Sequence, residues 1–111
     1  MLKPFAGGPK IALGMRFFGL RNFSREIGAE HLLNLPESQW KGVFLGHVAN
    51  PTATFHVSME GFLGNTTEEM IVNTMNEGTF TGWELQQLKQ AGRLGQVNFY
   101  KDGILVPNPF K

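Results

Sequence analysis

The chain has 111 residues and a formal net charge of +1 at pH 7; 17% of its residues are charged, 12% are aromatic and none is cysteine. This length suits one domain with a single hydrophobic core, and the absence of cysteine excludes disulfides and thiolate chemistry. No apolar run reaches the ~20 residues that a membrane-spanning helix needs. Few charges and many aromatic rings are typical of a protein that buries much of its surface, including surface against other chains.

Charge is divided unevenly along the chain. The first 25 residues hold five cations and no anion, whereas the remaining residues hold five cations and nine anions. Phenylalanines are interleaved with these first cations, as in an organelle transit peptide, but prolines and glycines interrupt any long amphipathic helix. A cleaved transit peptide is therefore not expected, and no secretory signal is evident. We therefore predict that residues 1–23 form a basic aromatic arm, extended or as an edge strand, on a compact α+β domain of residues 24–111. Such an arm is typical of attachment to a polyanion or to the acidic surface of a partner.

A short helix is expected next, over residues 24–33. Ser24 can cap this helix, and Glu26 stands in its first turn, where a negative charge is favourable. Pro36 would end it, because the residue before a proline is disfavoured in the helical conformation.

A β-hairpin is predicted over residues 42–59. In the segment TATFHVSM, residues 52–59, apolar and polar side chains alternate, which indicates a strand with one buried and one solvated face. The run GVFLGHV, residues 42–48, precedes it, and the intervening Ala-Asn-Pro is a turn signal. If the two strands pair antiparallel, His47 and His56 are diagonal neighbours on the solvated face.

Two capping boxes predict two helices after this hairpin. Thr66 is followed three residues later by Glu69, and Thr81 is followed in the same way by Glu84. In each box the hydroxyl and the carboxylate accept hydrogen bonds from backbone amides of the first turn. A glycine follows each helical stretch and would end the helix.

A second hairpin is predicted around Asp102-Gly103. The segments QVNFYK and ILV flank this dipeptide, which fits a type I′ turn with positive φ at both central positions. The predicted fold is a small single α+β domain with two antiparallel hairpins, two to three short helices and the basic N-terminal arm.

Two histidines are the candidates for a small enzyme or ligand-binding site. His47 and His56 would form a metal-binding or acid–base pair on the first hairpin. A zinc site needs three or four ligands, and no third ligand accompanies them, because His31 is expected on another element. Two ordinary surface histidines are the simpler interpretation, so no metal, cofactor or catalytic residue is predicted.

The segment 66–106 supports an alternative function. Two helices with a short turn between them, the second containing Leu85-x-x-Leu88, are followed by the hairpin at Asp102-Gly103. This order resembles the second half of a winged-helix DNA-binding domain, in which the second helix enters the major groove and the hairpin is the wing. The resemblance implies a nucleic-acid-binding regulator, because Gln can pair with adenine and Arg with guanine. The residues that it places against nucleic acid are Gln86, Gln87, Lys89, Gln90, Arg93 and Lys101.

The favoured function is a non-catalytic assembly or adaptor subunit that acts through protein–protein contacts. It would be a homo-oligomer or a component of a larger viral or organellar complex, and nucleic acid is the alternative partner. The low overall charge and the sparse cations of the arm favour protein as the partner. The composition is that of a soluble protein and does not specify a compartment. Aromatic anchors and arginines that would set the register form the predicted interface: Phe5, Arg16, Phe17, Phe18, Arg21, Arg25, Trp40 and Trp83.

Overall fold

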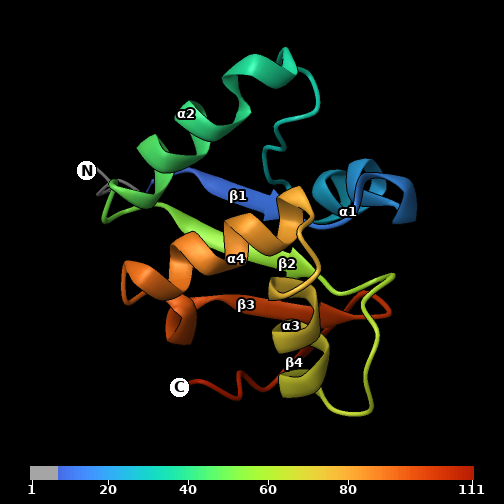
Figure 1. Ribbon diagram of the computed structural model, residues 1–111. Helices are drawn as coiled ribbons and strands as arrows, with labels where there is room; N and C mark the ends of the chain where they lie inside the picture. The colour runs from blue at the N-terminus through green and yellow to red at the C-terminus, as the bar shows by residue number, and fades with distance from the viewer. Residues whose placement is uncertain (1–7) are drawn as a thin grey trace, which may run out of the picture.

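A computed structural model describes residues 8–111 as a four-stranded sheet with helices packed against it (Figure 1). The strands are β1 (Lys10–Leu13), β2 (Thr54–Ser58), β3 (Asn98–Lys101) and β4 (Ile104–Val106). The helices are α1 (Leu20–Ile27), α2 (Glu37–Val48), α3 (Thr67–Met75) and α4 (Phe80–Gln90), with short 3-10 helices η1 (Arg16–Phe18) and η2 (Leu94–Gln96). Within the described residues, no helix combines the length and the apolar character that crossing a membrane requires.

The sheet is mixed, with the strand order β1-β2-β3-β4. β1, β2 and β3 run parallel, and β4 runs antiparallel to β3. Parallel strands need long crossover connections, and helices supply them here. α1 and α2 connect β1 to β2, and α3 and α4 connect β2 to β3. A mixed sheet with these helices makes the protein a small α+β domain, as predicted.

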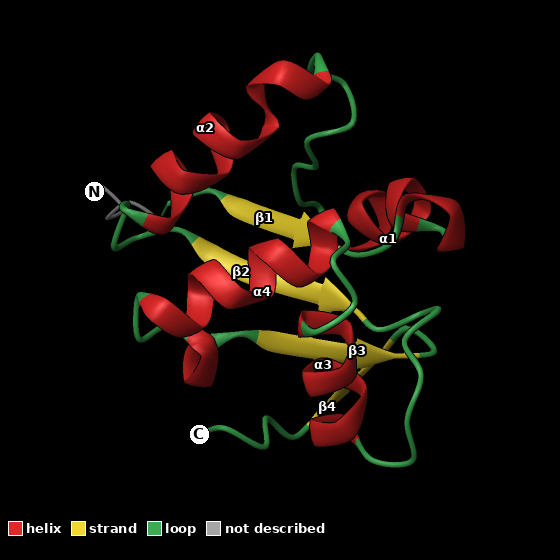
Figure 2. Ribbon diagram, viewed as in Figure 1, coloured by secondary structure: helices red, strands yellow, loops and turns green. Residues whose placement is uncertain are grey.

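The two sides of the sheet are covered unequally. Successive strand residues face opposite sides, so Phe55, Val57 and Phe99 enter the main core, which α2, α3 and α4 cover on one side (Figure 2). On the other side, Ala12 packs with Phe23 of α1 in a smaller cluster. The apolar core therefore lies mainly between the sheet and the three later helices.

The hairpin predicted over residues 42–59 is not formed. α2 occupies its first half, and β2 pairs instead with the parallel strands β1 and β3. The helix starts at Glu37, directly after Pro36, where the absence of a proline amide is tolerated. Trp40 and Phe44, one helical turn apart, both pack against the main core. The apolar run is thus the second half of an amphipathic helix, and Pro36 precedes a helix rather than ending one.

Two local features that the sequence predicts, the turn at Asp102-Gly103 and the cap at Thr66, are present in the structure. Asp102 (φ 53°) and Gly103 (φ 77°) both have positive φ in the turn that joins β3 to β4, as a type I′ turn requires. Thr66 caps α3 by accepting a hydrogen bond from the amide of Glu69 at 3.1 Å. The carboxylate of Glu69 accepts one from the amide of Asn65 at 2.8 Å, which satisfies a second amide near the start of this helix.

The described part of the predicted arm, from residue 8 to residue 23, is not a single extended segment. Residues 1–7, and Phe5 with them, lie outside the described residues. From Lys10 onwards the chain forms the edge strand β1, then η1, then α1. The backbone of Glu30 covers the outer edge of β1. Its amide donates to the carbonyl of Lys10 (2.9 Å), and its carbonyl accepts from the amide of Ala12 (2.7 Å). The segment from Lys10 to α1 is thus built into the sheet and its covering helix.

Candidate functional site

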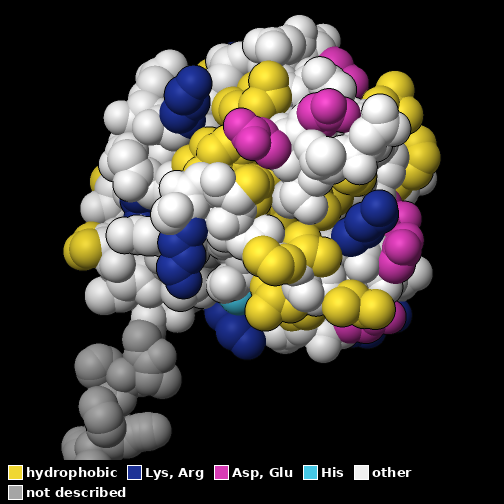
Figure 3. All heavy atoms as spheres, turned by 90° about the horizontal axis from the view of Figure 1, so that it is seen from below, with side chains coloured by type: hydrophobic (Ala, Val, Ile, Leu, Met, Phe, Trp, Pro, Cys, Tyr) yellow, Lys and Arg dark blue, Asp and Glu magenta, His cyan; other side chains and the backbone are white. Residues whose placement is uncertain are grey.

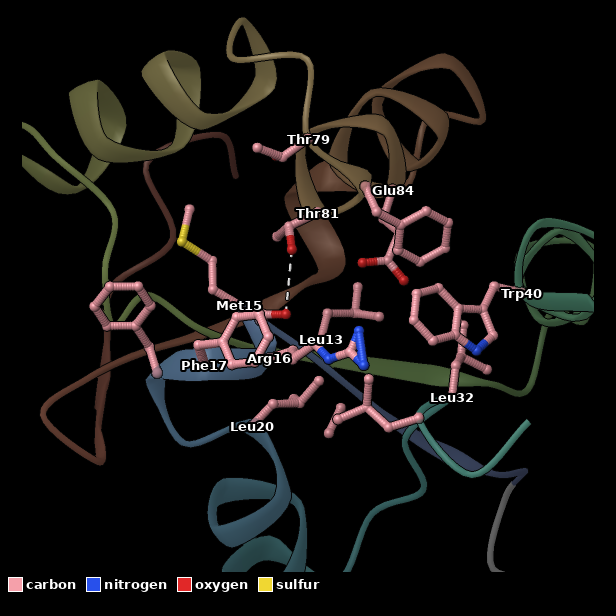
Figure 4. A pocket seen from close by; sticks show the side chains of 15 residues that line it. Leu13, Met15, Arg16, Phe17, Leu20, Leu32, Trp40, Thr79, Thr81 and Glu84 are labelled. Atoms are coloured by element: carbon pink, nitrogen blue, oxygen red, sulfur yellow. Dashed lines mark hydrogen bonds between the residues drawn. The ribbon is translucent and has the colours of Figure 1, made fainter. Parts of the chain in front are cut away.

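A pocket of about 370 Å³ lies at the carboxyl end of β1 (Figure 4). Leu13 and Gly14, the residues of η1, Trp40 in the first turn of α2, and the first turns of α4 all line it. The carboxyl ends of parallel strands are the usual position of ligands in sheets with helical crossovers. Its volume is in the range of pockets that hold small molecules. Most of the lining is apolar, and Arg16 and Glu84 are the charged side chains in it.

Two threonines fix the start of α4 against this pocket. Thr79 caps the helix by accepting a hydrogen bond from the amide of Gly82 at 3.0 Å. Thr81 donates from its hydroxyl to the carbonyl of Gly14 at 3.1 Å, the dashed line in Figure 4. Gly82 allows α4 to approach α3 closely, because a Cβ there would meet the backbone of α3. The helix therefore begins before the predicted capping box, and Glu84 turns inward.

Glu84 carries the one deeply buried carboxyl group of this lining. The residue is only 3% exposed, and its carboxylate points into the pocket (Figure 4). No residue from 8 to 111 hydrogen-bonds or pairs with this group, and burial alone raises the pKa of Glu84 well above its usual range. Every fully enclosed side-chain nitrogen or oxygen in this part of the chain has a partner. The carboxyl oxygens of Glu84 therefore still have open space in front of them, which the pocket supplies.

Arg16 lies at the solvent side of the pocket, and its charge is already engaged there. Its guanidinium carbon is 5.7 Å from the ring centre of Trp40 and 5.1 Å from that of Phe17. Its Nη1 atom is 3.7 Å from Oε2 of Glu37, in an ion pair that solvent reaches. Trp40 is held by its indole N–H, which donates to the carbonyl of Leu35 at 2.9 Å. These contacts direct the cation toward the rim rather than toward Glu84.

Two adjacent phenylalanines of η1 form an exposed apolar rim beside the pocket. Phe17 is 87% exposed and Phe18 is 55% exposed. The ring of Phe18 rests on the backbone of Gly61, where an added Cβ would lie 2.7 Å from it. Phe17 has no such support, and the Arg16 guanidinium covers only one face of its ring. Exposed aromatic rings beside an apolar hollow are typical of a contact surface.

The structure brings half of the predicted interface residues together at this pocket, namely Arg16, Phe17, Phe18 and Trp40. Arg21 and Arg25 are exposed nearby in the chain, on α1. Trp83 does not belong to this group, because it is half-buried in an aromatic cluster with Phe80, at 5.5 Å between ring centres. Phe5 lies outside the described residues.

The candidate histidines do not meet. His47 is in the last turn of α2, whereas His56 is in β2. The His56 ring lies between two hydroxyls, with Nε2 3.0 Å from Thr54 Oγ1 and Nδ1 3.3 Å from the Tyr100 hydroxyl. Burial and, second, the charge of Lys10 lower the pKa of His56. Among residues 8–111, no three His, Asp or Glu side chains gather as metal ligands.

Arg93, central to the nucleic-acid alternative, is engaged inside the fold. Its guanidinium donates to the backbone carbonyls of Val48 at 2.8 Å, Asn50 at 3.0 Å and Ala53 at 2.6 Å. It also lies 4.9 Å from the ring centre of Phe55. The side chain therefore ties the end of α2 to the start of β2 and does not point away from α4 into solvent.

The other residues of the nucleic-acid alternative lie on α4 and, in the case of Lys101, at the end of β3. Gln86 donates to the carbonyl of Met75 at the end of α3. Figure 3 views the molecule from below, toward the edge formed by β4, and basic and acidic side chains are interspersed on that face. Glu60 accepts a hydrogen bond from the Asp102 amide in the turn after β3, at 2.9 Å. This face lacks the concentrated positive charge that phosphate binding uses. The remaining residues of the set are exposed or half-exposed: Gln87, Lys89, Gln90 and Lys101.

Glu84 was missed as a site residue because a local rule explained it. Three residues after Thr81, it fits a capping box, and that interpretation places it at an exposed helix end. A second signal was present: Glu84 is four residues before Leu88, and therefore on the same helix face as a core leucine. The structure shows that Thr81, Glu84 and Leu88 are all buried.

Comparisons of this chain with protein-family models, with curated proteins and with solved structures found no match. The function must therefore be argued from the site itself. The exposed rings of η1 and the pocket with Glu84 carry that argument.

Proposed function

We propose that this protein is a non-catalytic assembly or adaptor subunit whose contact surface comprises η1, the exposed face of α1 and the rim of the pocket. The observation that supports this most strongly is that Phe17 and Phe18, adjacent in η1, are 87% and 55% exposed. Full burial of a phenylalanine contributes roughly 1.5–3 kcal/mol. A partner that covers both rings would gain most of this energy, and Trp40 and the pocket walls would extend the apolar area.

Charge defines the chemistry of the partner. Arg16 contacts the Phe17 ring, Arg21 and Arg25 are exposed on the following helix α1, and the first acidic residue of the chain is Glu26. A matching surface has an apolar centre surrounded by carboxylates. A second copy of this chain offers an acidic surface, because its residues from Glu26 onwards hold nine anions against five cations. The partner is therefore a second copy, or another subunit of a larger complex with the same surface chemistry.

The test is the triple variant Arg16→Glu/Arg21→Glu/Arg25→Glu, measured by native mass spectrometry of gently purified protein. Within residues 8–111 these side chains make one exposed ion pair, a long hydrogen bond of 3.4 Å and the aromatic contacts of Arg16 with Phe17 and Trp40. All of these are at the surface, so the melting temperature should fall only modestly. Association should be lost, because three repulsive charges replace three attractive ones. The matched control changes three exposed cations elsewhere to Glu and should assemble normally: Lys89, Lys101 and Lys111.

Two results would contradict the proposal. One is a triple arginine variant that assembles as the unmodified protein does. The other is an unmodified protein that is a bare monomer, without a partner chain, across the concentration range of the assay. Bound nucleic acid in the native mass spectrum would instead favour the winged-helix alternative, which draws less support because Arg93 and Gln86 are engaged within the fold.

A further inference from the structure

The pocket has a chemistry of its own, separate from the exposed rings of η1. Its lining combines apolar walls with one carboxyl group, that of Glu84, which is 3% exposed and points into the open space (Figure 4). A buried ionisable group without a partner destabilises a fold, because the charged form loses its hydration. Glutamine or leucine would fill the same position without that cost. The group is best explained by a ligand that completes it.

The other polar side chains around the pocket already have partners. The Thr79 hydroxyl accepts from the Gly82 amide, and the Thr81 hydroxyl donates to the Gly14 carbonyl. The cation at the rim, Arg16, is paired with Glu37 and stacked against aromatic rings. Glu84 is therefore the free polar side chain among the described residues of the lining, and it is an acid.

We propose that this pocket binds a primary ammonium group on a short apolar stem, with the ammonium paired to the Glu84 carboxylate. The ammonium would donate charge-assisted hydrogen bonds, which are about twice as strong as neutral ones. The apolar stem would lie against Leu13, Leu32 and Trp40. The inference does not depend on the partner-binding surface, because it requires the pocket but no second protein.

Anionic and neutral ligands fit the pocket less well. An anion would be placed against an acid in an apolar enclosure, where like charges repel strongly. A neutral ligand would need only a neutral hydrogen-bonding group, and it would leave the carboxyl group protonated. An ammonium ion uses the one property that distinguishes glutamic acid from glutamine at this position, namely its capacity to become charged.

Binding should release a proton. Burial raises the pKa of Glu84 in the empty pocket, so the free protein holds the carboxyl toward its protonated form. The balanced step is COOH plus R–NH₃⁺ giving the COO⁻···⁺H₃N–R pair plus one H⁺ in solvent. Arg16 is the other charged side chain in the lining, and it stays protonated throughout. Affinity for the amine should therefore increase as pH rises from acid toward neutral.

The experiment is isothermal titration calorimetry of the full chain with benzylamine, with benzyl alcohol as the neutral probe of matched shape. Titrations in two buffers of different ionisation enthalpy count the protons released. We expect benzylamine to bind, with proton release, and to bind more tightly than benzyl alcohol. Glu84→Gln should lower the affinity for benzylamine by about tenfold or more and abolish the proton release, while leaving binding of benzyl alcohol unchanged.

A second arm distinguishes the source of the ammonium. Lysine blocked at its amino and carboxyl termini would bind at least as tightly as benzylamine if the natural occupant is a side chain of a partner. Much weaker binding of the blocked lysine would indicate a free small amine. The variant Arg21→Glu/Arg25→Glu should lose association yet still bind benzylamine, so failure of the assembly proposal and failure of this one are distinguishable.

Three results would overturn the inference. They are no binding of benzylamine at millimolar concentration, equal affinity for benzylamine and benzyl alcohol, and an unchanged benzylamine affinity in Glu84→Gln. Because glutamine has nearly the same shape as glutamic acid and the carboxyl group has no protein partner within residues 8–111, the variant should fold. Its melting curve would verify this directly.

Discussion

Glu84 lies in the first half of α4 and Arg93 lies just after its end, and these two ionisable side chains have opposite surroundings. Arg93, just after the helix, donates to three backbone carbonyls within 3.0 Å and rests on an aromatic ring. Glu84, near the start of the helix, faces an apolar pocket and has no partner among residues 8–111. The difference separates a charge that holds the fold together from one that the fold leaves available. The second kind is the better pointer to a binding site.

The largest expected effect comes from removing the satisfied charge. Arg93→Ala would leave the carbonyls of Val48, Asn50 and Ala53 without their donor. We expect the free energy of unfolding to fall by about 3 kcal/mol, measured by urea denaturation. The stability of Arg93→Lys should lie between those of the wild type and Arg93→Ala, because one ammonium group cannot reach all three carbonyls. Exposed Lys89→Ala is the control, and a loss below about 0.5 kcal/mol in Arg93→Ala would show that these bonds are not structural.

The unsatisfied charge should show itself in the pH dependence of stability. The pKa of Glu84 is raised in the folded protein above the ordinary value of 4.5. Its contribution is therefore fully present below about pH 4.5 and is lost as pH rises toward the folded pKa, by at most about 1.4 kcal/mol per pH unit. Glu84→Gln does not titrate, so this variant should gain stability relative to the wild type between pH 4 and pH 8.

Urea denaturation of both proteins across that range tests this sign. Two parallel stability curves would mean that the folded protein already stabilises the charged carboxylate, which would remove the contrast with Arg93. Saturating benzylamine should abolish most of the difference at pH 8, because the ligand supplies the missing partner.

A smaller effect of opposite sign is expected from His56. Burial, and then Lys10, lower the pKa of this ring below 6.5. A lowered histidine pKa gives stability that is present above about pH 6.5 and is lost as pH falls toward the folded pKa. His56→Gln should therefore flatten the stability curve between pH 7 and pH 5. His31 has a pKa lowered by burial and by Arg21, so a residual slope should remain until His31→Gln is added.

The smallest effect is expected from the exposed pair of Arg16 and Glu37. Its atoms are 3.7 Å apart, and the two side chains are 43% and 73% exposed. Glu37→Gln should change the free energy of unfolding by less than about 0.5 kcal/mol, and less still at high salt. A loss above about 1 kcal/mol in thermal or urea unfolding would show that this pair fixes the pocket rim.

The features that the sequence predicted well are those governed by neighbouring residues. The turn at Asp102-Gly103 and the cap at Thr66 each depend on contacts within a few positions, and both have the expected geometry. The prediction of the first hairpin was wrong because the apolar pattern of residues 42–48 fits either a strand or a helix. Packing of Phe44 against Phe55 and Trp83, at 5.8 Å in each case, belongs to the helical alternative.

The candidate site was only half predictable for the same reason. Arg16, Phe17 and Trp40 were identified from charge and aromatic content, which are properties of the sequence itself. The burial of Glu84 depends on where α4 begins, and local rules make Thr79 and Thr81 equally good caps. The hydrogen bond from Thr81 to Gly14 links residues that are 67 positions apart in the sequence, so no local pattern could predict it.

The two edges of the sheet determine how far the protein could assemble through its strands. The backbone of Glu30 covers β1, whereas within residues 8–111 no strand pairs with the outer edge of β4, whose Ile104 and Leu105 are 67% and 56% exposed. Two copies joined through β4 would form one continuous sheet about a two-fold axis and would have no open edge left. Strand addition at β4 would therefore end at a pair, because the backbone of Glu30 already occupies the outer edge of β1 at Lys10 and Ala12.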